Sequence, residues 1–120
     1  MAFAKVTSGG NLATFVIDSA SVTATPDNNV LGTSGVLYGV YISNASSQIV
    51  YVKLWNHAGP TVGTTAPDEQ YPCPASGTRM YTIAEGTAYG TAISFACVQE
   101  AGTAGTTSPS AAVKVRLLVS

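Results

Sequence analysis

The chain has 120 residues, of which 46% are hydrophobic and only 9% are charged, and its formal net charge is −1. A chain of this length is expected to form one domain with its own hydrophobic core. An ordinary soluble domain has about 25% charged residues, so the low charge is the most unusual feature of the composition. The five basic and six acidic residues form no basic stripe, which argues against nucleic acid as a partner.

The most apolar stretch, Val36 to Ile42, is far shorter than the roughly 20 residues of a membrane-spanning helix. We therefore expect no membrane partner. The first residues, Met-Ala-Phe-Ala-Lys, lack the long apolar segment of a signal peptide, which predicts synthesis in the cytoplasm. In that compartment Cys73 and Cys97 are expected to stay reduced, without a disulfide. Neither has a histidine or a second cysteine at metal-ligand spacing, so we expect no metal site and no cofactor.

The apolar runs are rich in Val, Ile, Tyr, Phe and Thr, and clusters of Gly, Pro, Asn and Ser separate them at short intervals. This pattern is typical of strands rather than helices. It predicts an all-β fold, a single antiparallel β-sandwich of about seven strands, either immunoglobulin-like or jelly-roll-like. Residues 1–11 are predicted to form an N-terminal arm, and residues 12–120 the sandwich domain.

The first predicted strand, Leu12 to Ala24, is long and is expected to bend near Ser19, so that it could serve two sheets or embrace a neighbour. Thr25 to Asn29 is predicted to be a turn or short loop, because Pro and Asn residues favour turns. The clearest predicted hairpin follows, in which Gly35 to Ser43 pairs with Gln48 to Asn56 through a short polar turn.

The second half of the chain supplies the remaining strands. Glu69 to Cys73 lies among three prolines, which cannot donate to a β-ladder, and is predicted to be an edge strand or an extended loop. Three more strands are predicted at Thr78–Ala84, Thr91–Val98 and Ala111–Val119. In the last one, Lys114 and Arg116 form an outward row that alternates with inward apolar residues.

Two predicted loops share a short phrase, Gly-Thr-Thr-Ala-Pro at residues 63–67 and Gly-Thr-Thr-Ser-Pro at residues 105–109. Each follows one predicted strand and precedes the next. We interpret the phrase as two similar loops rather than as an internal duplication, which would need a longer repeat.

The sequence contains no catalytic constellation, and we expect the chain not to be an enzyme. His57 is the only histidine, and no nucleophile or orienting acid stands near it in the sequence. The acids are scattered, and the one adjacent pair, Asp68 and Glu69, would point to opposite faces of an extended chain. We expect this pair to lie on a solvated edge.

One strand carries large side chains on the face away from the core. Tyr51, Lys53 and Trp55 alternate with apolar residues, so the three share a face. Tyr and Trp are enriched where proteins contact proteins, and two rings side by side could also stack on a sugar. The row is therefore a candidate interface, with a surface glycan as a further candidate partner. The alternative is that another part of the chain covers this face.

Five phrases of the chain carry a family resemblance. They are Leu-Tyr-Gly-Val-Tyr-Ile-Ser-Asn at 37–44, Val-Tyr-Val-Lys-Leu at 50–54, Thr-Val-Gly-Thr-Thr-Ala-Pro-Asp at 61–68, Ala-Ile-Ser-Phe-Ala-Cys-Val at 92–98 and Gly-Thr-Ala-Gly-Thr-Thr at 102–107. Together they resemble small virion-associated proteins encoded among the structural genes of tailed bacteriophages. The resemblance spans roughly residues 36 to 119.

This resemblance implies a capsid decoration or cement protein, a knob-like β-sandwich on the outer capsid surface of the virion. Such a protein would bind across neighbouring major capsid subunits, as a homotrimer, and stabilise the expanded shell. In capsid proteins, arms such as the one predicted for residues 1–11 reach onto a neighbour, which makes Phe3 and Lys5 candidate interface residues. The alternatives are a tail, neck or fibre component of the virion, or a carbohydrate-binding module that uses Tyr51 and Trp55.

Overall fold

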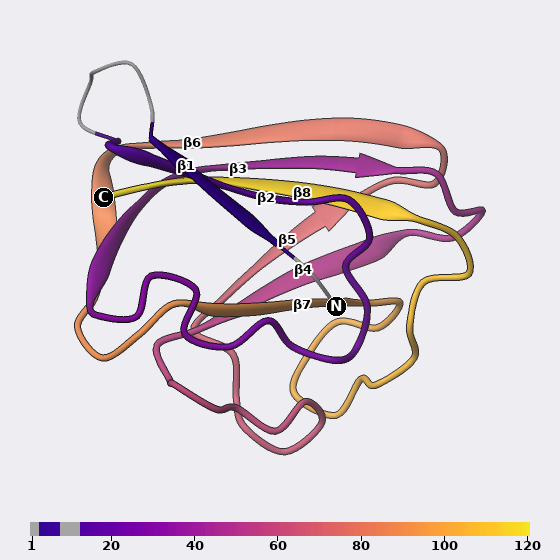
Figure 1. Ribbon diagram of the computed structural model, residues 1–120. Coiled ribbons are helices and arrows are strands. Elements are labelled where there is room, and N and C mark those ends of the chain that lie inside the picture. The colour runs from indigo at the N-terminus through magenta and orange to yellow at the C-terminus, as the bar shows by residue number, and fades with distance from the viewer. Residues whose placement is uncertain (1–2, 8–12) are drawn as a thin grey trace.

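Two antiparallel β-sheets pack face to face in the computed structural model, which describes residues 3–7 and 13–120 (Figure 1). The described residues contain eight strands: β1 (Ala4–Thr7), β2 (Phe15–Ser19), β3 (Gly35–Asn44), β4 (Val50–Trp55), β5 (Glu69–Cys73), β6 (Gly77–Tyr89), β7 (Ser94–Val98) and β8 (Val113–Val119). One sheet has the order β1-β2-β8-β3-β6 and the other the order β5-β4-β7. The predicted all-β sandwich is confirmed, with one strand more than expected because β1 lies inside the predicted arm.

The strands pair in a nested order. β2 pairs with β8, β3 with β6, and β4 with β5, so strands of the first half lie beside strands of the second half in reverse order. The segment between β2 and β3 completes the series by pairing with β7 through Asp27 and Phe95. This is a long antiparallel hairpin rolled into two sheets, the arrangement of a jelly roll. It differs from the order of the immunoglobulin-like alternative.

The chain changes sheets directly after β2. β2 ends at Ser19, and the chain then runs along the open edge of β7, where Asp27 and Phe95 exchange backbone hydrogen bonds with N···O distances of 2.9 and 3.1 Å. The predicted bend near Ser19 is therefore confirmed. The turn predicted over Thr25–Asn29 is wrong in part, since the backbone at its centre is paired with a strand.

The predicted hairpin between Gly35–Ser43 and Gln48–Asn56 is wrong in its pairing, although both strands exist. β3 belongs to the five-stranded sheet and β4 to the three-stranded sheet. The short polar connection therefore carries the chain across the sandwich instead of turning it back within one sheet. β5 lies at the edge of its sheet, as its prolines predicted.

The corner between β3 and β4 is organised by Asn44, which is 2% exposed. Its Nδ2 donates to the backbone oxygens of Gln48 at 2.8 Å, Pro74 at 3.0 Å and Cys73 at 3.4 Å. Its Oδ1 accepts hydrogen bonds from the backbone nitrogen and the hydroxyl of Ser46, at 2.9 and 2.7 Å. One amide thus joins the corner after β3 to the chain that leaves β5, where a second crossing between the sheets begins.

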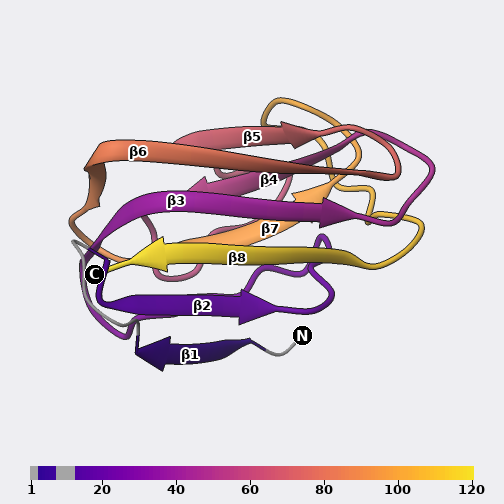
Figure 2. The same ribbon diagram turned by 90° about the horizontal axis from the view of Figure 1, so that it is seen from above.

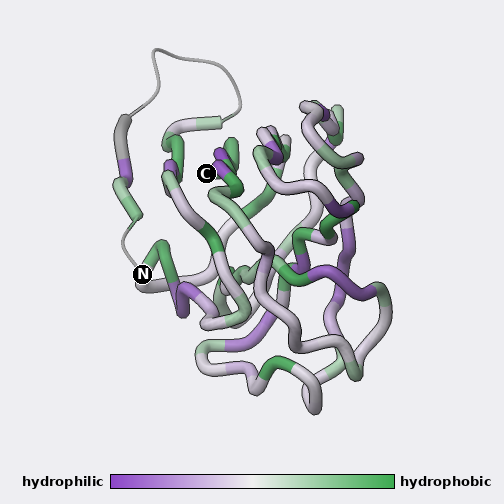
Figure 3. The backbone as a smooth tube through the Cα atoms, turned by 90° about the vertical axis from the view of Figure 1, so that its right-hand side faces the viewer, coloured by the Kyte–Doolittle hydropathy of each residue, from purple (hydrophilic) through white to green (hydrophobic). Residues whose placement is uncertain are grey.

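The core lies between the two sheets and comes from alternate positions of their strands. Both inward rows read from the sequence are confirmed as buried: Val50, Val52 and Leu54 on β4, and Val113, Val115, Leu117 and Val119 on β8. Figure 3 shows hydrophobic and hydrophilic residues alternating near the C-terminus, where β8 runs. No helix of the described ranges is long and apolar enough to cross a membrane.

Cys73 and Cys97 lie in this core as unpaired thiols. Burial raises the pKa of the Cys97 thiol to about 12 and also raises that of Cys73. A thiolate is therefore disfavoured at both positions, and neither side chain is suited to nucleophilic or redox chemistry.

Substitution of Asn44 by Ala is expected to lower the free energy of unfolding by about 3 kcal/mol, because it leaves several buried backbone groups without a partner. Asn28 is exposed, and Asn28→Ala is the matched control, expected to change stability by less than about 0.5 kcal/mol. Urea unfolding followed by circular dichroism measures both. Equal stability of the two variants would contradict the role given to Asn44.

Candidate interaction surfaces

The row of Tyr51, Lys53 and Trp55 lies on the outer face of β4, as the alternation predicted. Lys53 and Trp55 are each only 1% exposed, however, and Tyr51 is half-buried. The prediction of an open interface is therefore wrong for Lys53 and Trp55 in the single chain. The physical reason is that two loops of the same chain cover this face of the three-stranded sheet.

The first of these loops, residues 61–66, covers Trp55. The indole Nε1 donates to the backbone oxygen of Thr65 at 2.9 Å. The loop is closed on itself, because the backbone nitrogens of Thr64 and Thr65 both donate to the oxygen of Thr61, at 3.0 and 2.8 Å. Trp55 consequently has no exposed ring face on which a sugar could stack.

The second loop, residues 99–107, covers Lys53. Its Nζ donates to the backbone oxygen of Gly102, and the nitrogen of Gly102 donates to Oε1 of Gln70 at 2.8 Å. Both backbone polar groups of Gly102 are thus bonded to side chains of the sheet. Burial lowers the pKa of Lys53, and the charge of Glu100 opposes this effect.

The two loops also contact each other. A Cβ added at Gly63 would lie 2.5 Å from Cγ2 of Thr106, and Gly63 has a positive φ of 94°. Glycine is therefore required at this position for both space and backbone conformation. The two loops that share the Gly-Thr-Thr phrase form one cover, which lies beneath the three-stranded sheet in Figure 1.

Phe3 lies just before β1 and Lys5 lies within it, at the edge of the five-stranded sheet. Phe3 is 40% exposed, and Lys5 is exposed with its Nζ 4.8 Å from the centroid of the Phe15 ring. β1 pairs with β2 over its full length, from Ala4 opposite Asp18 onward. Part of the predicted arm is thus an edge strand of the chain's own sheet. The interface role of Phe3 and Lys5 stays a prediction.

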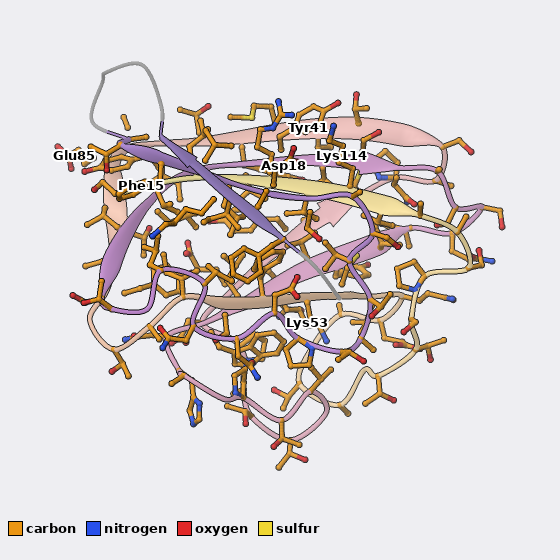
Figure 4. The ribbon with its side chains drawn as sticks, in the orientation of Figure 1. Phe15, Asp18, Tyr41, Lys53, Glu85 and Lys114 are labelled. Carbon is orange, nitrogen blue, oxygen red and sulfur yellow. The ribbon has the colours of Figure 1, made fainter. Side chains whose placement is uncertain are left out.

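The five-stranded sheet presents a second surface, which we call the outer sheet face. Its side chains come from four strands: Val16, Asp18, Tyr41, Met80, Arg116 and Leu118. No described segment lies over this side of the sheet in Figures 1 and 2. Figure 4 shows Asp18, Tyr41 and Lys114 on the side of the sheet away from Lys53.

The outer sheet face combines apolar groups with one ion pair. Met80 is 49% exposed, and a Cβ added at Gly39 would lie 3.0 Å from Cε of Met80 and 3.1 Å from Cδ1 of Leu118, so both side chains lie over Gly39. Beside them, Nη2 of Arg116 lies 3.5 Å from Oδ2 of Asp18. Oδ1 of Asp18 is buried and has no hydrogen-bond partner in the described structure.

The outer sheet face was not recognised from the sequence. Lys114 and Arg116 were placed in an outward row, and Leu118 continues that row, which is the one local signal available. Tyr41 and Met80 join it only because β8, β3 and β6 are neighbours in the sheet. That adjacency depends on long-range pairing, which no local pattern reports.

Of the residues considered for chemistry, Asp68 lies near His57, because its Oδ2 accepts a hydrogen bond from the backbone nitrogen of Asn56 at 2.6 Å. His57 is exposed, and its Nδ1 accepts a hydrogen bond from the backbone nitrogen of Gly59 at 2.8 Å. Asp68 is exposed as predicted, but Glu69 is half-buried and accepts hydrogen bonds from the hydroxyls of Tyr71, at 2.7 Å, and Tyr89. No group of three His, Cys, Asp or Glu residues in the described ranges could hold a metal ion.

Comparison with known proteins gave no match: no family model, no curated protein and no solved structure is detectably similar to this chain.

Trp55 is the only tryptophan of the chain, so its intrinsic fluorescence reports the loop cover directly. We expect emission shifted to the blue of free tryptophan and little quenching by iodide. Trp55→Phe should lower the free energy of unfolding by about 1 kcal/mol through loss of the bond to Thr65. Tyr51→Phe is the control, with little expected change. Strong iodide quenching of the folded protein would show that the cover is absent in solution.

Asp27 provides a test of stability against pH. It is 5% exposed, its Oδ2 has no partner in the described structure, and burial raises its pKa to about 6. The folded state therefore binds this proton more tightly than the unfolded state, whose Asp pKa is about 3.9. The contribution to stability is complete below about pH 4 and is lost as the pH rises through about 6.

Asp27→Asn should remove this dependence and raise the free energy of unfolding at neutral pH by about 1 kcal/mol, after allowance for solvent screening. Urea unfolding at about pH 4 and about pH 7.5 measures the effect. Glu85→Gln, at an exposed position, serves as control and should leave the pH profile unchanged. A wild-type profile that rises between these two pH values would contradict the assignment.

Proposed function

We propose that this chain is a structural virion protein that decorates the capsid of a tailed bacteriophage. It would bind across neighbouring major capsid subunits on the outer surface and stabilise the expanded shell. The observation that carries the proposal is the outer sheet face, a broad, partly apolar surface on a sandwich whose other sheet is covered by its own loops. The proposal also rests on the resemblance drawn from the phrases within residues 36 to 119, to which the comparisons with known proteins added no match.

The composition of the outer sheet face suits a protein partner. Its half-buried Val16, Tyr41 and Leu118 and its exposed Met80 surround an ion pair that includes Arg116. Tyr, Met and Arg are enriched in the interior of protein interfaces, where other charged residues are depleted.

The mechanism would be thermodynamic. A protein that binds the assembled shell and not its separated subunits stabilises the assembly by mass action. Contacts repeated over many copies, or linking two subunits at once, multiply a modest contact energy. The homotrimer that the resemblance implies stays a prediction.

A carbohydrate-binding module is less well supported, because Trp55 is covered and bonded to Thr65. A tail, neck or fibre component would use the same kind of surface, and no observation on this chain favours it. Immunogold labelling of virions separates the two virion locations, since label confined to the tail would overturn the proposal.

Binding to capsids tests the outer sheet face. Purified protein is expected to bind expanded capsids assembled without it and to raise their disruption temperature. Leu118→Lys should weaken this binding at least about tenfold, because it places an unpaired charge in the interface. Thr64→Lys, at an exposed position in the loop cover, is the matched control and should bind like the wild type. Wild-type protein that fails to bind, or a Leu118→Lys variant that binds equally well, would contradict the proposal.

A further inference from the structure

β6 has 13 residues and forms one edge of the five-stranded sheet (Figure 2). Gly77–Thr82 and Thr87–Tyr89 pair with β3, and residues 83–86 lie in a bulge between these two paired parts. The other sheet edges are shorter or protected. β1 has four residues, β5 contains Pro72, and the edge of β7 is occupied at Asp27. Within the described ranges, β6 is therefore the one long strand edge that carries neither a proline nor a covering segment.

An edge of this kind is a template for pairing with another chain. Its unpaired N–H and C=O groups can accept a further strand, and proteins that remain monomeric usually interrupt such edges with charges or proline. The centre of β6, Met-Tyr-Thr-Ile-Ala at residues 80–84, has neither. The charged residues of β6, Arg79 and Glu85, stand at the two ends of this stretch.

We propose that β6 pairs with β6 of a second copy of this chain, antiparallel and centred on Thr82. A two-fold axis at Thr82 places Arg79 of each copy opposite Glu85 of the other. Both side chains are exposed, and neither forms an ion pair within the described chain. Because Arg79 and Glu85 are six residues apart, they project to the same side of the strand, so the pairing creates two symmetric opposite-charge pairs.

The other residues of this register also match. Tyr81 falls opposite Ile83, and both are half-buried side chains that already pack against the core. Such aromatic and β-branched pairs are favourable across strands. On the outer face, the large Met80, which is 49% exposed, falls opposite the small Ala84. The charged pair, the pair on the core side and the pair on the outer side are therefore all compatible with the same register.

The shape of β6 limits the pairing to the same stretch. Gly86 has a positive φ of 77°, and residues 83–86 have no partners on β3, since Thr82 lies opposite Gly39 and Thr87 opposite Leu37. Half-buried and exposed side chains nevertheless alternate from Tyr81 to Ala84. The strand bends sharply at this end in Figure 2. The part before Gly86 begins at Gly77, and Thr82 lies close to its midpoint.

Disulfide trapping tests the register. In the proposed pair the two Thr82 residues lie opposite each other, at Cα separations of about 4.5–5.5 Å, within the range of a disulfide. Thr82→Cys should therefore form a covalent dimer under mild oxidation. Thr78→Cys is the matched control, because the two Thr78 residues would lie about 27 Å apart. The native thiols are buried and should not take part. Equal cross-linking of both variants, or of neither, would overturn the proposal.

Charge exchange tests the contact without a cross-link. Light scattering after size exclusion should give twice the chain mass for the wild type, whereas the homotrimer that the resemblance implies would give three times the chain mass and would contradict the two-fold pair. Arg79→Glu and Glu85→Arg should each weaken dimerisation about tenfold or more, because like charges then face each other, and the double variant should recover it. Lys114→Glu, on the same sheet but away from the edge, should leave the dimer unchanged. A monomer at high concentration, or a larger oligomer insensitive to these changes, would contradict the pairing.

These measurements use isolated protein and no capsid, so they are independent of the proposed function. If the protein dimerises through β6 but does not bind capsids, the proposed decoration function is wrong and the proposed pairing still stands.

Discussion

The buried amide of Asn44 is the interaction on which the arrangement of the two sheets depends. It bonds to Gln48 and Ser46 in the corner after β3 and to Cys73 and Pro74 at the end of β5. Both places are points where the chain leaves one sheet for the other. In a jelly roll every later strand pairs with an earlier one. The points where the chain crosses between the sheets must therefore be fixed for the later strands to find their partners. A side chain that satisfies both corners at once therefore stabilises the whole nested order.

That order leaves the two sheets with different surroundings. The outer side of the three-stranded sheet is closed by two loops, held through Trp55 to Thr65 and through Lys53 to Gly102. The outer side of the five-stranded sheet has no such cover in the described structure. Burial of Lys53 beneath the loop disfavours its charged form. This desolvation offsets part of the stability that the loop contacts contribute.

The open outer sheet face and the β6 edge belong to the same sheet but differ in chemistry. The face presents side chains, whereas the edge presents backbone groups framed by Arg79 and Glu85. A two-fold pair through the edge would continue the sheet and place two outer sheet faces side by side. Both surfaces would then join this chain to others, as the proposed role in an assembly requires.

Local patterns were sufficient for most of the strands, but not for β1, which lies inside the predicted arm. Alternation in β4 and β8, the prolines of β5 and the bend at Ser19 were read correctly, because each depends on neighbouring residues alone. Which strands pair with each other could not be predicted from local patterns. Two strands with a short polar connection read as a hairpin, but β3 pairs with β6 and β8 whereas β4 pairs with β5 and β7. The row of Tyr51, Lys53 and Trp55 was assigned to the right face, but its cover comes from loops up to about 50 residues away. Whether an outward side chain is exposed depends on what packs over it, and that is decided by tertiary structure.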